Sequence, residues 1–291
     1  MSNPRYKLTG EQRKAMLDMY VNSDASAYRI GKTFGVSTVN VTATAKRKGV
    51  LRIRHEPPLF TKRCSVNDRF FDAIDTEHKA YWLGFIGADG GVYETNVVLG
   101  LAEKDGEHLE LFCSEVESTY KIGRSLNRAT SDPDGKQYVK VCTAIYSRHM
   151  AEVLRGYGIE TGDARFSNGF PPMPEELFPH FCRGLFDGDG GFGQVRRGKN
   201  IGLRLFFTSL WPVTEQFKKA LMENCHTGDA KLNKQGPGGK TACLHYKGNL
   251  QVGRIVEWLY RNATVWLPRK RILAEEVLNR PRLRAPRVFK C

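Results

Sequence analysis

The stretch Trp82-Leu83-Gly84-Phe85-Ile86-Gly87-Ala88-Asp89-Gly90 recurs as Cys182-Arg183-Gly184-Leu185-Phe186-Asp187-Gly188-Asp189-Gly190. In both copies an apolar run of helical character leads into a small residue, an aspartate and two glycines. We predict that each copy is a helix that ends at a glycine cap. Self-similarity at a period of about 100 residues indicates two paired domains, each of which begins with this helix.

The two repeated helices are expected to pack against each other and to bring Asp89 and Asp189 together. Small residues four positions apart share one face of each helix and allow two backbones to approach closely, namely Gly84 with Ala88 and Gly184 with Gly188. Two adjacent carboxylates repel each other unless a divalent cation lies between them. A single copy would equally fit a buried helix with a glycine stop, but the repetition of both acidic residues favours a metal site.

The repeated nonapeptide resembles the LAGLIDADG motif of homing endonucleases, in the single-chain form with two motifs. The resemblance covers residues 77–280. It implies intron homing by a nuclease that cuts double-stranded DNA at one specific site and hydrolyses one phosphodiester per strand. The sixth motif position is Gly87 in the first copy and Asp187 in the second. That position is not the metal ligand in the family, so the change does not imply loss of activity.

The resemblance also implies which residues hold the metal. The eighth motif position is the acidic ligand in the family, and it falls on Asp89 and Asp189. We expect these carboxylates and the carbonyl groups of Ala88 and Gly188 to bind Mg²⁺ or Mn²⁺ at the interface of the two motif helices. Such a site would activate water and stabilise charge on the phosphate.

Further catalytic residues are implied by the same resemblance. The segment around Lys270 resembles the one that carries the active-site lysine near the end of each unit, and its counterpart in the first unit is Arg165. Arginine keeps the charge but does not readily exchange a proton, so we expect two unequal half-sites. A polar residue after the first hairpin of each unit falls on Glu103 and Ser209.

A net charge of +14 and a pI near 9.5 indicate a polyanionic partner. The seven cysteines form no CxxC pair, and no apolar run approaches the length of a membrane span. The first residues do not resemble a signal peptide. We therefore expect an intracellular monomer, cytoplasmic or organellar and associated with the nucleoid, that is not secreted and binds no membrane.

Residues 1–55 are expected to form a small helix-turn-helix domain. Apolar spacing predicts three helices, and Ser37 is placed to cap the third after a tight turn. The segment carries eleven basic against three acidic residues, which favours DNA binding over an ordinary pair of helices. The candidates for contact with DNA are Asn40, Thr42, Lys46, Arg47, Arg52 and Arg54.

The remaining chain is predicted to be α+β. A basic linker over 56–76 precedes two pseudo-symmetric αββαββα units with antiparallel saddle sheets, over 77–170 and 171–280, and a basic tail over 281–291. Alternation along the strands predicts a half-buried sheet with a basic, amide-rich outer face that suits a DNA groove, although a merely solvated face is the alternative. The candidate contacts are Lys140, Gln194, Arg196, Arg197, Arg204, Lys231, Asn233 and Gln235.

Two other functions fit parts of this sequence. Some proteins of the resembled family are intron maturases, which bind their own intron RNA and assist splicing. The helix-turn-helix would also suit a regulator that binds DNA without cutting it. The intact acidic pair argues against a protein that has lost cleavage, but it is compatible with a dual role in which the endonuclease also acts as a maturase on its own intron RNA.

Overall fold

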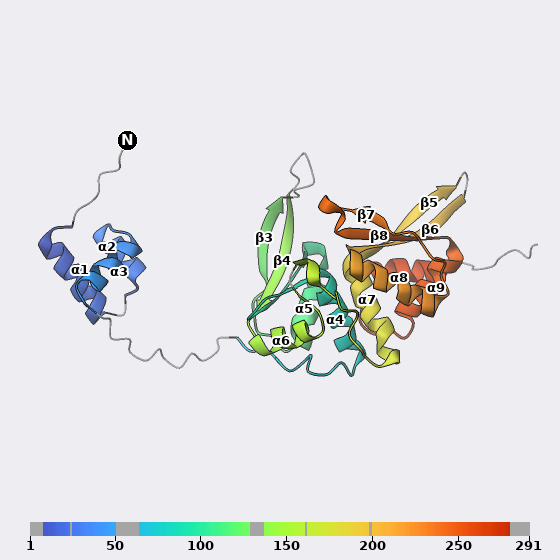
Figure 1. The fold of residues 1–291 in the computed structure, drawn as a ribbon, viewed down its shortest axis with the longest axis horizontal. Coiled ribbons are helices and arrows are strands. Elements are labelled where there is room, and N and C mark those ends of the chain that lie inside the picture. The colour runs from blue at the N-terminus through green and yellow to red at the C-terminus, as the bar shows by residue number, and fades with distance from the viewer. Residues whose placement is uncertain are drawn as a thin grey trace, which may run out of the picture. The chain divides into compact units, whose positions relative to one another are not determined.

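The computed structural model of the chain describes residues 8–23, 25–50, 64–128, 137–160, 162–197 and 200–279. The chain divides into two compact units, Met1–Arg63 and Cys64–Cys291 (Figure 1). Two predicted DNA contacts, Arg52 and Arg54, and the predicted tail lie outside the described residues. Within the described ranges, no helix has the length and apolar character that would cross a membrane.

The N-terminal unit contains the three helices that the sequence predicted: α1 (Gly10–Asn22), α2 (Ala27–Phe34) and α3 (Thr38–Arg47). Met16, Ile30 and Val41 form its small core. The Ser37 hydroxyl accepts a hydrogen bond from a backbone N–H in the first turn of α3, as expected of a cap. Gly35 ends α2 in the left-handed conformation, with φ of 65°.

The larger unit contains the αββαββα order twice, as the sequence predicted. The first repeat consists of α4 (Glu77–Asp89), β1 (Gly90–Val92), β2 (Val97–Ala102), α5 (Gly106–Glu115), β3 (Gly123–Arg128), β4 (Gln137–Ile145) and α6 (Arg148–Gly156). The second consists of α7 (Phe178–Asp189), β5 (Gly190–Arg197), β6 (Asn200–Leu210), α8 (Trp211–Cys225), β7 (Asn233–Gln235), β8 (Thr241–Lys247) and α9 (Asn249–Tyr260). A last helix, α10 (Pro268–Leu278), follows.

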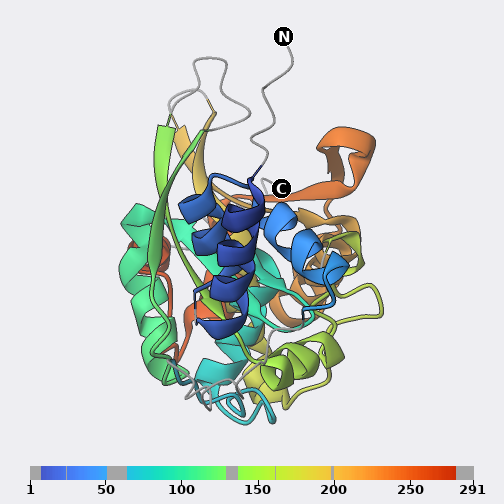
Figure 2. The same cartoon turned by 90° about the vertical axis from the view of Figure 1, so that its left-hand side faces the viewer.

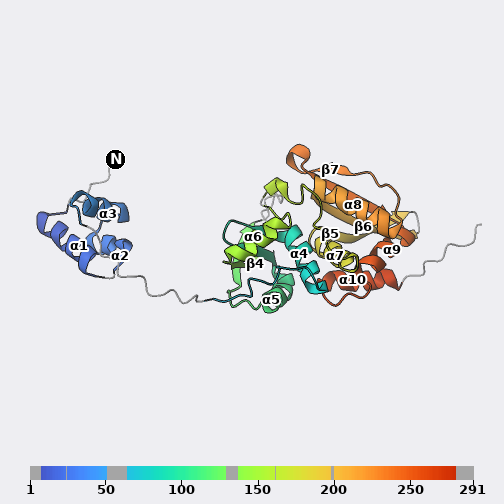
Figure 3. The same cartoon turned by 60° about the horizontal axis from the view of Figure 1, so that its bottom comes forward.

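The strands form two antiparallel sheets of the same topology, with orders β1-β2-β4-β3 and β5-β6-β8-β7. The register aligns Gly90 with Leu99 in the first sheet and Gly190 with Phe207 in the second. Helices cover one face of the sheets, as the labels in Figures 1 and 3 show. Figure 2 shows the green strands of the first repeat rising to one side of its helices.

The motif helices α4 and α7 pack with almost no side chain between their backbones. A Cβ atom added to Gly84 would lie 2.0 Å from the Phe181 carbonyl oxygen, and one added to Gly184 would lie 2.0 Å from that of Tyr81. Near the carboxyl ends, a Cβ on Gly188 would lie 2.2 Å from that of Ala88. Only glycine permits this approach, so the predicted small-residue faces do form the contact between the helices.

The glycine after each motif aspartate acts differently from the predicted left-handed cap. Gly90 and Gly190 have extended backbones, with φ of −85° and −99°, and start strands β1 and β5 directly. A Cβ atom on Gly90 would lie 2.6 Å from the Ile86 carbonyl oxygen, and one on Gly190 would lie 2.2 Å from the ring of Phe186. Lack of space, not a positive φ, therefore accounts for glycine at these positions.

Part of the segment assigned to a linker packs on the larger unit. Phe71 is fully buried and Ile74 is 9% exposed, and both belong to the same apolar core as the motif helices. The backbone N–H of Asn67 donates to the Val116 carbonyl oxygen at 2.9 Å. Residues 64–76 therefore belong to the folded unit, and the division between the two units falls at Arg63.

We predict that Gly184→Ala destabilises the larger unit by at least about 2 kcal/mol, because the methyl group would collide with backbone that cannot move without separating the helices. Thermal unfolding measures the effect. The matched control is Gly156→Ala, at a helical glycine with no atom within 4 Å of an added Cβ, where stability should be unchanged or slightly raised. Equal midpoints for the two variants would contradict the assigned backbone contact.

Candidate active site

The carboxylates of Asp89 and Asp189 lie at the adjacent carboxyl ends of α4 and α7. A Cβ atom on Gly188 would lie 3.5 Å from Asp89 Cγ, which shows how closely the two ends meet. Burial raises the pKa of Asp189 to about 6, a hydrogen bond from Ser209 opposes this shift, and the charge of Asp89 adds to it. Asp89 retains access to solvent, yet desolvation by the surrounding protein raises its pKa, opposed chiefly by Lys270. Two carboxylates are thus held together at an energetic cost.

Lys270 is buried and closes the end of α7. Its Nζ atom donates to the carbonyl oxygens of Phe186 at 2.7 Å, Asp187 at 2.6 Å and Gly190 at 2.6 Å. Three acceptors satisfy the three ammonium protons and place a positive charge at the negative end of the helix dipole. Desolvation lowers the pKa of Lys270 to about 8, opposed first by the Asp187 carboxylate.

Arg165 occupies the equivalent place at the end of α4. Its Nη1 atom donates to the carbonyl oxygens of Gly87 and Ala88, each at 2.7 Å, and its Nη2 atom donates to that of Gly90 at 2.8 Å. The sequence alignment of Arg165 with Lys270 thus agrees with the geometry. The two cations differ in one respect, since the guanidinium engages the Ala88 carbonyl whereas Lys270 donates to the oxygens before and after Gly188.

Asp187 organises the end of α7 and the start of α10, and it is not one of the two expected metal ligands. Its fully buried carboxylate accepts hydrogen bonds from Tyr81 at 2.9 Å, Tyr260 at 2.5 Å and the backbone N–H of Leu267 at 2.8 Å. The last bond fixes the start of α10, which carries Lys270. Burial raises the pKa of Asp187, and the charge of Lys270 opposes that shift.

The first half-site needs glycine where the second has Asp187. A Cβ atom on Gly87 would lie 2.7 Å from the ring of Phe166, so this ring fills the space that a side chain would take. Phe166 is fully buried and follows Arg165 directly. Sequence reasoning did not assign Asp187 this role, although an acid present in only one copy of a repeat was the signal that it has a partner unique to that copy.

The two predicted polar residues after the hairpins are not equivalent. Ser209 is 8% exposed and donates to Asp189. Because Leu99 and Phe207 share a register position, the counterpart of Ser209 in the first repeat is Leu101, two positions before Glu103. Glu103 instead forms an ion pair with Arg124 at 3.1 Å. The alignment was wrong by two residues because the first hairpins of the two repeats differ in length.

The outer faces of both sheets carry polar side chains. Asn233 and Gln235 of β7 pair with Cys243 and Thr241, which puts them on the same face as Arg204, as predicted. On the corresponding face of the first sheet, Lys140 lies opposite Ser125. The outer face of the second sheet also carries His245 and Lys247, which were not predicted from the sequence. Lys231 is exposed just before β7.

Gln194 does not join this outer face. It pairs with Leu203, whose side chain is buried, so it projects to the side of the sheet that the helices cover, although it is itself exposed. The backbones of Arg196 and Arg197 lie in β5, and their side chains are outside the described part of the structure.

All four described candidates on α3 are exposed: Asn40, Thr42, Lys46 and Arg47. Thr42 uses its hydroxyl internally, donating to the carbonyl oxygens of Thr38 and Val39. Val39 is 74% exposed on the same helix, which is unusual for an apolar side chain and was not anticipated. The helix therefore offers a mixed apolar, amide and basic surface.

The donor set suits a hard divalent cation that is shared with a phosphate. Within the described ranges, no group of three His, Cys, Asp or Glu side chains could hold a metal ion alone. Mg²⁺ usually takes one or two carboxylates and completes its shell with water and substrate phosphate oxygens. The pair Asp89 and Asp189 meets that requirement, and the raised pKa of each carboxyl shows that a positive ion would relieve an unfavourable charge.

No protein-family model and no curated protein sequence matches the chain. Among solved structures, the chain is similar to the meganuclease I-SmaMI bound to uncleavable DNA, with a TM-score of 0.45 and 13% identity, covering 70% of this chain and 91% of that one. It is also similar to the LAGLIDADG meganuclease I-AabMI bound to uncleaved DNA, with a TM-score of 0.46 and 12% identity, covering 68% of this chain and 87% of that one. A third similar structure is the LAGLIDADG homing endonuclease I-GzeII in complex with its DNA target. Its TM-score is 0.42 and its identity is 10%, and the match covers 68% of this chain and 88% of that one. The strand order and the side-chain contacts of this chain define its fold and its candidate site without these similarities.

We predict that Asp189→Asn stabilises the metal-free protein at pH 8. The folded pKa of about 6 lies above the ordinary 3.8, so the stability that protonated Asp189 supplies is complete below pH 3.8 and is lost as the pH rises through 6. The advantage of the variant should grow by about 2 kcal/mol between pH 4 and pH 8 and then level off. Urea unfolding in a chelator measures it, with the exposed Glu160→Gln as control. A gain independent of pH would contradict the shifted pKa.

Proposed function

We propose that the chain is a metal-dependent endonuclease of the LAGLIDADG type that cuts both strands of one long double-stranded DNA site. The observation that carries the proposal is the meeting of Asp89 and Asp189 at the ends of two interlocked helices, each end closed by its own cation. Two such half-sites side by side match the two phosphodiesters of a duplex. The outer sheet faces add a polar surface for the DNA groove.

The residues of the chain have distinct tasks in this mechanism. Asp89 and Asp189 would hold the divalent ions together with the carbonyl groups of Gly188 and Ala88, and the Ala88 carbonyl also accepts a hydrogen bond from Arg165. When bound, the ions supply a water of lowered pKa and neutralise charge on the phosphate. Arg165 and Lys270 fix the helix ends and add positive charge beside the scissile phosphates, while Ser209 orients Asp189.

The first experiment is selection of cleaved molecules from a randomised double-stranded DNA library in Mg²⁺, with Ca²⁺ as the control ion. The proposal expects one long site, cut on both strands with a short stagger, in Mg²⁺ only. Enrichment in Ca²⁺ without cutting in Mg²⁺ would favour a non-cleaving DNA-binding regulator. Filter binding that prefers structured RNA to duplex DNA would instead favour an intron maturase.

We predict that Asp89→Asn and Asp189→Asn each slow cleavage of the selected site more than about 100-fold, because each removes a charged metal ligand. Affinity for the same DNA in Ca²⁺ should change far less, since the sheets supply most of the contacts. Glu276→Gln, at an exposed carboxylate on α10, is the matched control and should cut at the parent rate. Full activity of either aspartate variant would remove the proposed metal site.

The N-terminal unit is proposed to bind DNA through α3. We predict that Lys46→Ala with Arg47→Ala weakens DNA binding similarly for all sequences and lowers the slope of log affinity against log salt by about 2, because two phosphate contacts are lost. Titration of labelled DNA at several salt concentrations measures the slope. Lys14→Ala on α1 is the control for loss of charge, and an equal effect there would argue against a specific role of α3.

A further inference from the structure

A hydrogen bond from the second repeat reaches the segment that carries Arg165. Gln216 on α8 donates from Nε2 to the carbonyl oxygen of Phe166 at 2.8 Å and to that of Pro212, on its own helix, at 3.1 Å. Phe166 has a positive φ of 50°, which is unfavourable for an aromatic residue and needs surrounding contacts to persist. Gln216 therefore anchors a strained turn directly after the site cation.

The turn is also held by its own backbone and by buried contacts with both motif helices. The Gly169 N–H donates to the same Phe166 carbonyl oxygen at 3.1 Å. The Phe166 backbone N–H donates to the Gly158 carbonyl oxygen at 2.8 Å. Its ring packs on Phe181 at 5.6 Å between centroids and fills the space left by Gly87. A shift of Phe166 would displace the neighbouring Arg165 from the carbonyl oxygens that close α4. The position of the Arg165 guanidinium therefore depends on the hydrogen bond between Gln216 and Phe166.

The equivalent helix of the first repeat makes a related contact in the opposite direction. Six residues after the end of β2 stands His108, and six residues after the end of β6 stands Gln216. His108 is buried and bonds through Nε2 to the Tyr81 hydroxyl at 2.8 Å, and that hydroxyl donates to Asp187, which holds the start of α10. Each repeat therefore supports the segment that bears the other repeat's cation.

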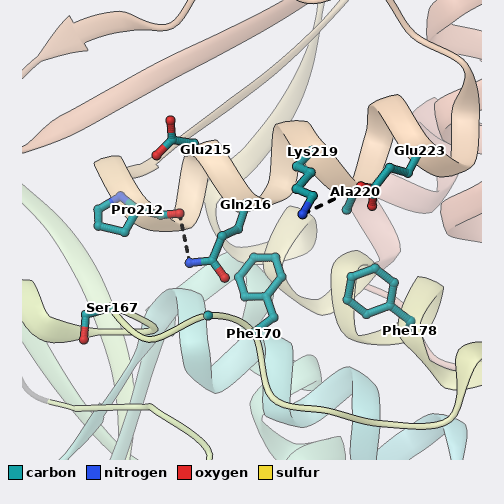
Figure 4. Close-up of a pocket in the computed structure, with 10 residues that line it drawn as sticks. Ser167, Phe170, Phe178, Pro212, Glu215, Gln216, Lys219, Ala220 and Glu223 are labelled. Atoms are coloured by element: carbon teal, nitrogen blue, oxygen red, sulfur yellow. Dashed lines mark hydrogen bonds and ion pairs between the residues drawn. The ribbon is translucent and has the colours of Figure 1, made fainter.

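Gln216 also lies at the surface, where it can be altered without rebuilding the core. Figure 4 shows it on α8 between Phe170 and Pro212, in the wall of a pocket of about 510 Å³. Its neighbour Glu215 lines the same pocket and is exposed. Gln216 donates to the Phe166 carbonyl, and the exposed Glu215 beside it on the same helix can serve as the control position.

We propose that Gln216 is the positioning residue of the Arg165 half-site, acting across the two repeats through the Phe166 carbonyl. Its effect on cleavage rests on the endonuclease function proposed above, whereas its effect on the turn does not. Loss of the bond changes one half-site only, because the Lys270 segment is held by a different set of contacts through Asp187.

The decisive variant is Gln216→Glu, which keeps the shape but replaces the donor with a charged acceptor facing the Phe166 carbonyl. In single-turnover cleavage with both strands labelled, we expect one strand to be cut about tenfold more slowly, and it should be the strand that Arg165→Ala also slows. The other strand and the Kd for DNA should be unchanged. Adding Gln216→Glu to Arg165→Ala should give no further slowing.

A second measurement needs neither metal nor DNA. Hydrogen exchange of the free protein should become faster in residues 162–169 of Gln216→Glu, and stay unchanged in residues 265–270. Gln216→Met, which removes the donor without adding a charge, is used in both measurements if the first variant fails to fold. Glu215→Gln is the matched control and should behave as the parent in each.

The outcomes separate the two proposals. Equal slowing of both strands, or unchanged exchange at residues 162–169, would overturn the positioning role of Gln216. If the parent protein cuts no DNA under any condition, the endonuclease proposal fails, while exchange at residues 162–169 still decides whether Gln216 holds the turn.

Discussion

The contact between the backbones of α4 and α7 is the constraint on which the larger unit depends. Gly84 and Gly184 each meet a carbonyl oxygen of the opposite helix, so no residue larger than glycine fits at either position. The close contact continues to Gly188 and Ala88. The carboxylates of Asp89 and Asp189, which follow directly, are therefore brought together. Desolvation at this junction raises the pKa of both carboxyl groups, and the charge of Asp89 raises that of Asp189 further.

The repeats solve the same problem of closing a helix end by different chemistry. Lys270 sits on a regular helix whose start is fixed by the buried carboxylate of Asp187. Arg165 sits on a tight turn whose position depends on the ring of Phe166 packed against Gly87. The half-sites are thus alike in where positive charge lies and unlike in what holds it there, so pseudo-symmetry of the fold does not extend to the contacts around the cations.

Much of this structure could be predicted from sequence because the determinants were local and occurred twice. Apolar spacing, turn residues and the repeated motif located the helices, the strands and the acidic pair. The roles of Asp187 and Gln216 could not be found in that way, because Gln216 contacts a residue 50 positions away and Asp187 contacts one 80 positions away. The alignment of Glu103 with Ser209 failed for a related reason: the first hairpins of the two repeats differ in length, and only the strand pairing shows that Leu101 is the counterpart of Ser209.

A charge pair joins the start of α4 to the middle of α7 and makes the contact between the two repeats asymmetric. The fully buried Arg183 donates to Glu77 at 2.8 Å, and Glu77 also accepts from the backbone of Thr264. At the corresponding positions of the other repeat stand Leu177 and Leu83. Two copies of the first repeat would set Glu77 against leucine, and two copies of the second would bury Arg183 without its acid. Each repeat is therefore complementary to the other repeat and not to a second copy of itself. A symmetric dimer of either repeat would be less stable than the pair formed within one chain.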